Sequence, residues 1–255
     1  MPASTLYAFT LSFLAGISTV IGALIIFLDK NKNEKIVIGS LSFAAGVMIC
    51  VSLTDLLPSS YSLILNGAKA FPKVMLTLIF MVIGIIISML IDKYLPDQAS
   101  DRKGGKSLYK IGIISMVAII LHNIPEGIAT FITSSNNIKL GITLTVAIAL
   151  HNIPEGISIA IPIYHSTGNK LKAFLYALIS GMSEVLGAIL AYLILAPFVN
   201  DHIMAALYAI IAGIMIHISI YELIPGAYKN GTLKQVLKYL IIGALVMVLS
   251  HLLME

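Results

Sequence analysis

Eight runs of predominantly apolar residues follow one another along the chain, each long enough to cross a lipid bilayer. A helix needs about 20 apolar residues to span the hydrocarbon core, whereas a strand of a membrane barrel alternates apolar and polar side chains over about ten residues. The runs are apolar throughout, so they predict an all-α integral membrane protein with eight transmembrane helices. The expected spans are approximately residues 6–28, 36–57, 74–95, 109–132, 140–163, 172–198, 203–225 and 235–254.

The composition of the chain agrees with this fold class. Hydrophobic residues make up 58% of the chain and charged residues 11%, against about 45–50% and about 25% in soluble domains. The single cysteine, Cys50, excludes an internal disulfide framework. No soluble segment combines basic with aromatic side chains, so no nucleic-acid partner is expected. The longest polar connector is `PDQASDRKGGKS` (96–107), and we expect residues 1–255 to form a single transmembrane domain.

The basic residues predict the orientation in the membrane. If the chain crosses the bilayer at each span, the loops at 28–36, 92–110, 164–172 and 226–238 share one side and hold 13 of the 16 lysines and arginines. Cytoplasmic loops carry an excess of such residues. We therefore expect these loops in the cytoplasm of a cell whose plasma or inner membrane holds the protein, with both termini outside.

Two distant segments resemble one another: `AGVMICVSLTDLLP` at 45–58 and `AGIMIHISIYELIP` at 212–225. Most positions are identical or exchange Val, Ile and Leu, and Asp55 matches Glu222 as an acid. The expected topology makes the two segments run in opposite directions, as in the inverted repeats of secondary transporters, whose cargo binds near the midplane. We therefore predict a 3+2+3 arrangement, in which helices 1–3 and 6–8 are inverted repeats around a central pair. Similar packing demands on similar helices are the alternative explanation.

The central pair of helices carries one motif twice, `LHNIPEG`, starting at residues 121 and 150. Residues i and i+4 of a helix lie on one face, with Cβ atoms about 5–6 Å apart. His122 and Glu126 form such a pair, and so do His151 and Glu155. Two neighbouring helices thus offer two imidazoles and two carboxylates, which are ligands for a divalent transition metal.

The other residues of the motif favour a polar cavity around those ligands. Asn123 and Asn152 lie about 100° round the helix from their histidines, so their carbonyl oxygens can serve an adjacent position. Pro125 and Pro154 each remove a backbone donor and predict kinked or unwound helix, which a membrane tolerates where protein, water or an ion satisfies the released carbonyl. The glycine after each glutamate removes bulk beside the carboxylate.

Intramembrane acids are costly, since one at the bilayer centre costs about 2.5–3.5 kcal/mol on insertion scales. No lysine or arginine lies deep enough in a span to pair with the acids of this chain, so they indicate a cation from solution, or protons. Glu184 stands in `SGMSEVLGA`, where small neighbours allow close packing against the central pair; a protonated glutamate bonded across helices is the competing interpretation. The five acids are Asp55, Glu126, Glu155, Glu184 and Glu222.

Four further residues are weaker candidates. Met48 can offer a thioether, although most of the 11 methionines must serve packing. His217 stands where the other repeat has Cys50, and a lone membrane histidine is more often a hydrogen-bonded structural group than a ligand. Asp55 and Glu222 come before prolines near the ends of their spans and are candidate gate or entrance groups.

At these residues the chain resembles the ZIP (Zrt/Irt-like) family of metal transporters, and within it the bacterial zinc-uptake branch. The resemblance rests on the two `LHNIPEG` motifs, `SEVLGA`, `AAGVM` with `SLTDLLP`, and `YELIP`, and it extends over nearly the whole chain. It implies a binuclear metal centre, with Asp55 as an entrance residue near the external face. The first metal position would use His122, Glu126, His151, Glu155 and Met48, and the second Asn123, Asn152 and Glu184, with Glu126 and Glu155 bridging the two.

The resemblance also implies an elevator motion of spans one, four, five and six against the other four, in a homodimer. One feature departs from many members of the family. The cytoplasmic loop between spans three and four contains no histidine here, which argues against metal capture by that loop.

We therefore expect uptake of a divalent transition metal into the cytoplasm, with zinc as the leading ion and iron, manganese and cadmium as further ones. The metal is cargo, and no cofactor is expected. An intramembrane zinc protease needs `HExxH` on one helix, and each helix here offers only `HxxxE`. A proton relay, or a b-type haem carrier that uses His122 and His151, would also explain polar groups within the spans, but the adjacent acids and amides suit a haem pocket poorly.

Overall fold

A computed structural model describes residues 3–28, 33–65, 67–94, 108–195, 198 and 200–254. Every regular element in these ranges is helical, and eight helices are long and apolar enough to cross a membrane. They run over Ser4–Leu28, Glu34–Leu63, Ala70–Tyr94, Leu108–Asn136, Ile138–Thr167, Lys170–Ile194, Asp201–Asn230 and Leu233–Ser250. The predicted class of an all-α membrane protein with eight spans is confirmed. The predicted connector at 96–107 lies outside the described residues.

Several helices extend beyond the apolar stretches that predicted them, because capping residues decide where they begin. Asn137 accepts hydrogen bonds from the backbone of Lys139 and Leu140, at 3.1 and 3.2 Å, so the fifth span starts before its apolar run. Asn200 caps the seventh span in the same way.

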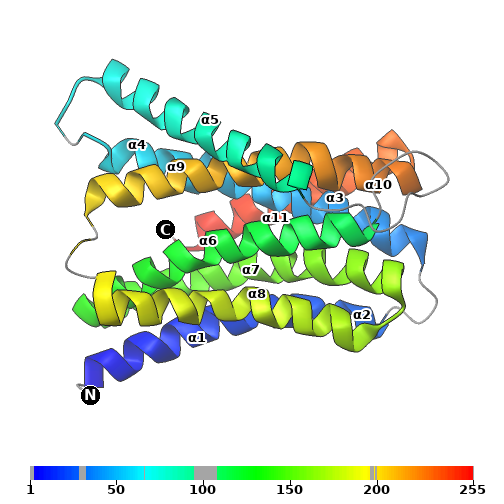
Figure 1. Ribbon diagram of the computed structural model, residues 1–255, viewed down its shortest axis with the longest axis horizontal. Coiled ribbons are helices and arrows are strands. Elements are labelled where there is room, and N and C mark those ends of the chain that lie inside the picture. Colours follow the sequence, from blue (N-terminus) through cyan, green and yellow to red (C-terminus); the bar gives the residue numbers. More distant parts are fainter. Residues whose placement is uncertain are drawn as a thin grey trace.

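The elements shown in Figure 1 are α1 (Ala3–Ala23), α2 (Ile25–Leu28), α3 (Glu34–Val51), η1 (Ser52–Leu56), α4 (Leu57–Leu63), α5 (Ala70–Tyr94), α6 (Leu108–Asn136), α7 (Ile138–Thr167), α8 (Lys170–Leu190), η2 (Ala191–Leu195), α9 (Asp201–Ile218), η3 (Ser219–Leu223), α10 (Ile224–Asn230) and α11 (Leu233–Met254).

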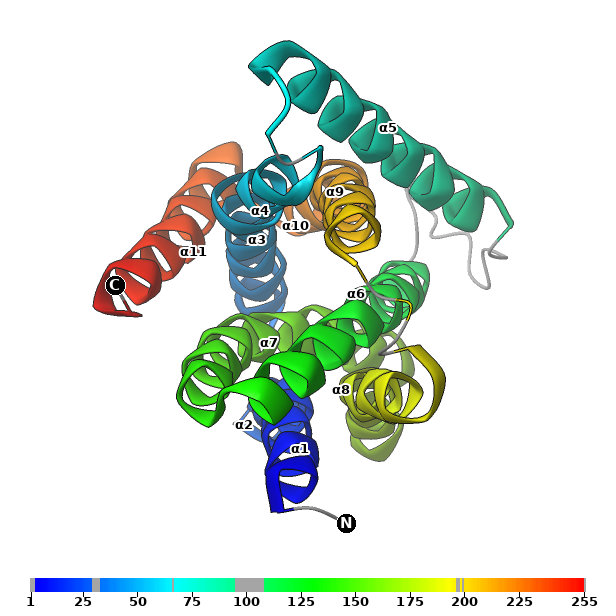
Figure 2. The same cartoon turned by 90° about the vertical axis from the view of Figure 1, so that its left-hand side faces the viewer.

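The long helices form two groups (Figure 2). The first group consists of α1, α6, α7 and α8, which pack on one another, and the second of α3 with α11 and α9 with α5. The main contact between the groups is made by α3 against α7. The central helix pair α6 and α7 therefore belongs to the first group and faces the second.

Close helix contacts in the first group depend on glycine. A Cβ atom on Gly127 of α6 would collide with the backbone carbonyl of Glu184 on α8. A Cβ atom on Gly156 of α7 would collide in the same way with the carbonyl of Thr19 on α1. These are the glycines that follow Glu126 and Glu155, so the absence of a side chain brings α8 and α1 against the residues next to those acids.

The two segments that resemble one another in sequence adopt the same local structure. Each contains a π-helical turn, η1 or η3, followed by a short helix that begins beside a proline, and the sequence repeat pairs the two sets of boundaries residue for residue. The hydroxyl of Ser52 donates to the carbonyl of Met48 at 2.7 Å, and that of Ser219 donates to the carbonyl of Met215 at 2.8 Å. These matches support the predicted 3+2+3 inverted repeat, which remains a prediction.

Candidate metal site

The histidines and glutamates of the doubled motif converge where α6 and α7 lie side by side. Nε2 of His122 lies 3.2 Å from Oε1 of Glu126, one turn along the same helix. Nε2 of His151 reaches the same Oε1 at 3.1 Å from α7. The candidate ligand atoms of these three residues all lie within 4.8 Å of one another, so together they can hold a metal ion.

The fourth residue of the doubled motif adjoins this cluster. Oε1 of Glu155 lies 3.4 Å from Nε2 of His122, and the two imidazole rings are 5.9 Å apart between centroids. The spacing of the motif therefore predicted correctly that both helices direct their polar groups to one place. Both helices run unbroken through Pro125 and Pro154, so the unwound backbone that the prolines suggested is not found.

The cluster is buried and its charges are only partly compensated. His122, Glu126, His151 and Glu155 are between 1% and 7% exposed, and within the described residues the ion-pair partners of the two glutamates are histidines alone. One oxygen of Glu126 and both of Glu155 have no hydrogen-bond partner within the described residues. Burying carboxylates in this way is costly unless a charge or donor satisfies them, and a divalent cation would do so.

The two asparagines lie beside the cluster with fixed amide groups. Nδ2 of Asn123 donates to the carbonyl of Ser180 at 3.1 Å, and Nδ2 of Asn152 donates to that of Ala15 at 3.1 Å. Nδ2 of Asn152 also donates to Oε2 of Glu184 at 3.0 Å. Because the nitrogens are engaged, Oδ1 of each asparagine and Oε1 of Glu184 remain as buried acceptors without a hydrogen-bond partner in the described residues. Glu184 therefore does reach the central pair, as the sequence predicted.

The weaker candidates lie in the second group of helices. Met48 is fully buried in α3 within the large apolar core. Nδ1 of His217 lies 2.9 Å from the hydroxyl of Ser88 on α5, and its ring stacks on Tyr221 at 4.7 Å. His217 thus joins α9 to α5, which fits the structural role expected of a lone histidine. Glu222 is 1% exposed.

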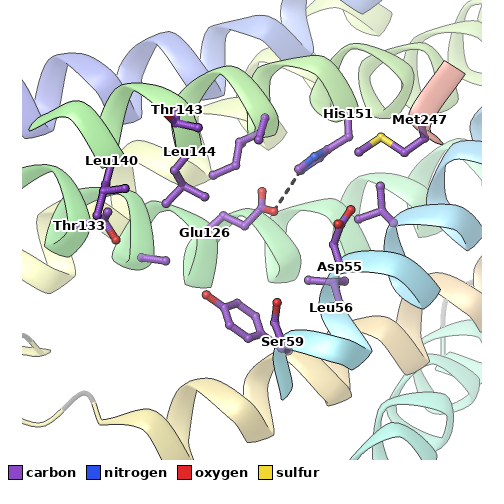
Figure 3. A pocket seen from close by; sticks show the side chains of 15 residues that line it. Asp55, Leu56, Ser59, Glu126, Thr133, Leu140, Thr143, Leu144, His151 and Met247 are labelled. Carbon is purple, nitrogen blue, oxygen red and sulfur yellow. Dashed lines mark hydrogen bonds and ion pairs between the residues drawn. The ribbon is translucent and has the colours of Figure 1, made fainter. Parts of the chain in front are cut away.

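A cavity of about 490 Å³ adjoins the cluster, and Glu126 and His151 are among its lining residues (Figure 3). Asp55 also lines it, and the cavity reaches Thr133 and Leu140 beside the turn between α6 and α7. The remaining lining residues are Val51, Leu56, Ser59, Ala129, Thr143, Leu144, Ala147, Ile148, Tyr208 and Met247.

Sequence reasoning missed Tyr208 and the small polar residues of this lining, because single polar groups scattered over separate spans form no motif. It also missed Ala15 and Ser180, whose carbonyls hold the asparagines. A signal for those two was present, since `AGISTVIGA` at 15–23 resembles `SGMSEVLGA` at 180–188.

Several known proteins are similar to this chain over nearly its whole length. The family model described as ZIP Zinc transporter matches residues 95–251. A zinc transporter ZupT of Streptococcus mutans is 40% identical over 256 residues, covering 96% of this chain and 97% of the relative. Proteins of the same name from Clostridium perfringens and Campylobacter jejuni are also 40% identical, over 98% and 95% of this chain and 96% and 94% of their own lengths.

Proposed function

Because the chain belongs to the ZIP family of zinc transporters, we propose that it carries zinc across the membrane into the cytoplasm, on the polar groups of α6, α7 and α8. The observation that carries this proposal is the buried cluster of His122, Glu126, His151 and Glu155, whose carboxylates have only histidines as ion-pair partners in the described part of the chain. Imidazole nitrogen and carboxylate oxygen are ligands that zinc accepts. The same ligands suit iron, manganese and cadmium, which we propose as further cargo.

The site is proposed to hold two ions. His122 and His151 would bind the first ion, with Met48 as an additional ligand from α3. The second ion would lie between Oδ1 of Asn123, Oδ1 of Asn152 and Glu184, with Glu126 and Glu155 bridging the two positions. The oxygens of the asparagines and of Glu184 support the second position, because each is buried and has no hydrogen-bond partner among the described residues.

The direction of transport is inferred from the cavity. It reaches the turn between α6 and α7, which the loop charges predict to lie outside the cell together with both termini. Asp55 lines the same cavity and lies close to His151, on the side of Glu126 away from Thr133 and Leu140 (Figure 3). From the family resemblance, Asp55 is proposed as the entrance residue, and its carboxylate would attract cations into the cavity.

Alternating access is supported by the internal repeat. Two repeats are involved: 45–58 with 212–225 pairs α3, η1 and α4 with α9, η3 and α10, and the doubled `LHNIPEG` motif pairs α6 with α7. Each cavity-lining residue of α3 to α4, α6, α7 and α9 has a counterpart in these repeats that is buried. Thus Leu140, which is 57% exposed, corresponds to Ile111, which is 2% exposed. The counterparts also pack closely on one another. A methyl group on Gly226, the counterpart of Ser59, would lie 2.6 Å from Ile111 and 3.3 Å from Leu41. We propose that these buried counterparts line the exit to the cytoplasm when the outer cavity closes.

Flux of zinc into proteoliposomes tests the proposed function. We expect the double variant His122→Ala with Glu126→Ala to lose zinc flux, because it removes an imidazole and the carboxylate shared by both histidines. The matched control is His202→Ala with Glu34→Ala, which removes one group of each kind from exposed positions. Wild-type flux through the first variant would overturn the proposal.

The proposed exit is tested by thiol labelling from each side of the membrane. Ser115→Cys, made in a Cys50→Ala background, places the one thiol at a buried counterpart of Leu144, a cavity-lining residue. We expect zinc turnover to expose this thiol to a cytoplasmic reagent. If labelling is equal in resting and transporting vesicles, this exit route is wrong.

Two further proposals concern the setting of the protein. The family resemblance favours a homodimer in the cell membrane, which crosslinking in native membranes followed by mass measurement would detect. We also propose that the protein is not an enzyme, in keeping with relatives that are named as transporters. A zinc-loaded sample that cleaves membrane peptides would contradict this.

A further inference from the structure

The first span contains an unrecognised counterpart of Glu184. Aligning `AGISTVIGA` (15–23) with `SGMSEVLGA` (180–188) pairs Gly16 with Gly181 and, three positions later, Thr19 with Glu184. The second metal position as proposed above has one acid from α8 and nothing from α1.

Contacts in the structure follow the same pairing. A Cβ on Gly16 would meet the carbonyl of Gly181, and a Cβ on Gly181 would meet that of Gly16, so α1 and α8 cross at these two glycines. The same added atom on Gly16 would lie 3.4 Å from Cβ of Glu184, and on Gly181 it would lie 3.1 Å from Cβ of Thr19. Thr19 and Glu184 thus stand on opposite sides of one helix crossing.

The surroundings of the two residues also correspond. The carbonyl of Thr19 packs on Gly156, and that of Glu184 packs on Gly127. Asn152 donates to Ala15, four residues before Thr19, and Asn123 donates to Ser180, four residues before Glu184. Thr19 therefore has the same relation to α7 as Glu184, the acid that completes the second metal position, has to α6.

The hydroxyl of Thr19 is buried without its usual local partner. Threonines in helices commonly donate to the carbonyl four residues earlier, as Thr10, Thr54 and Thr145 do here at 2.9, 3.0 and 2.8 Å. For Thr19 that acceptor is the carbonyl of Ala15.

The Ala15 carbonyl already accepts from the hydroxyl of Ser18 and from Nδ2 of Asn152 at 3.1 Å. The backbone N–H of Thr19 also donates to this carbonyl in the helix. A carbonyl oxygen has two lone pairs, so none is left for the Thr19 hydroxyl. Thr19 is 0% exposed, and its hydroxyl has no hydrogen-bond partner within the described residues.

We propose that Thr19 is an ion-binding residue of the second metal position, where its hydroxyl faces the ion from the side opposite Glu184 and holds one of the ion's own water molecules. A threonine side chain ends two bonds short of a glutamate carboxylate, so it meets the ion through a water. The position then has one non-bridging carboxylate, that of Glu184, whereas a glutamate at residue 19 would give it two. The ion keeps part of its hydration and is released more readily, because conduction requires binding that is favourable but not too tight.

This inference rests on the proposed function, and the test separates the two. Zinc uptake is measured over a range of concentrations for Thr19→Val, which removes the hydroxyl at nearly constant shape, and for Thr19→Ser, which keeps it. The control is Thr77→Val on α5, since the hydroxyl of Thr77 is also buried and unpartnered within the described residues but lies in the other group of helices.

We expect Thr19→Val to raise the KM for zinc about threefold to tenfold, in line with the loss of one hydrogen bond, while Thr19→Ser and Thr77→Val keep the wild-type KM. Thr19→Glu should lower the Kd for zinc and slow turnover at saturating zinc. The inference would be overturned by an unchanged KM in Thr19→Val, or by a KM raised equally in Thr19→Val and Thr19→Ser. If the valine variant does not fold, Thr19→Ala gives the same comparison. Should Glu126→Gln also transport zinc normally, the proposed function itself fails; if Glu126→Gln is inactive and Thr19→Val is normal, only the role of Thr19 fails.

Discussion

Zinc should stabilise the folded protein through Glu126, and this linkage can be measured. Oε1 of Glu126 lies within 3.2 Å of one histidine and 3.1 Å of the other, so Glu126→Gln removes the one charged oxygen that both imidazoles share. Gln keeps the shape and a hydrogen-bonding carbonyl, which limits the structural disturbance. We take the loss of this ligand to weaken zinc binding about 100-fold, the upper end of what losing even an outer-shell partner of a metal ligand costs.

The size of the effect follows from binding to the native state. A ligand present at 100 times its Kd stabilises by about 2.7 kcal/mol, and the same ligand at a Kd 100-fold weaker by about 0.4 kcal/mol. For a chain of this size about 1 kcal/mol corresponds to about 2–4 °C in Tm. Wild-type protein should therefore gain about 5–10 °C with zinc, and the variant about 1–2 °C.

Cys50 provides the assay. It is the single cysteine of the chain and is 8% exposed in the folded protein, so a thiol-reactive dye reports unfolding in detergent without an introduced label. Glu34→Gln, at an exposed position, is the control and should keep the full zinc-dependent shift. If Glu126→Gln also keeps it, the zinc-binding role of the cluster is refuted.

Three other outcomes are expected. Gly127→Ala should lower the free energy of unfolding by about 1–3 kcal/mol, because the added methyl meets the carbonyl of Glu184. The control Gly39→Ala, whose added methyl would have its nearest neighbour 3.7 Å away, should leave the free energy of unfolding unchanged. Equal denaturant midpoints for the two variants would contradict this packing. Asp55→Asn should reduce zinc uptake at low zinc and low ionic strength about tenfold or less, with the difference disappearing in high salt. An effect independent of salt would argue against attraction of cations by this carboxylate. Uptake should weaken as the outside pH falls below about 6.5, since protons compete with zinc for the imidazoles of His122 and His151; a flat pH profile from about 8 to about 5 would contradict binding by these histidines.

The parts of this protein that were predictable from its sequence are those that local periodicity controls. Eight apolar runs became eight spans, and the i, i+4 spacing of His122 and Glu126 put them on one face of α6. The π-helical turns η1 and η3 were not predicted, because a bulge depends on tertiary packing that leaves no period in the sequence. Of the kinked or unwound helix predicted at Pro125, the unwound form is not found, since neighbouring helices can support a backbone that proline alone would break.

The geometry between helices was the least predictable part. Which carbonyl orients Asn152 depends on how closely α1 approaches α7, and that distance is set by Gly22 and Gly156, whose positions admit no side chain. Nothing in the local sequence of α7 identifies Ala15 as its partner. Only comparison of the first and sixth spans with each other reveals that both helices make the same contact, and this similarity is weaker than the doubled motif.

The distribution of polar groups between the two groups of helices bears on how transport is achieved. The histidines, asparagines and glutamates of the proposed site all lie on α6, α7 and α8, and Thr19 lies on α1, so one packed group carries them together. Asp55 and Tyr208 line the cavity from the second group, through η1 and α9, and Met48 belongs to α3 of the same group. A displacement of one group against the other would therefore keep the histidines, asparagines and glutamates together, and would change their position relative to Met48 and Asp55. The tight glycine contacts within the first group favour such a rigid displacement, since a packed interface of this kind moves as a unit more readily than it deforms.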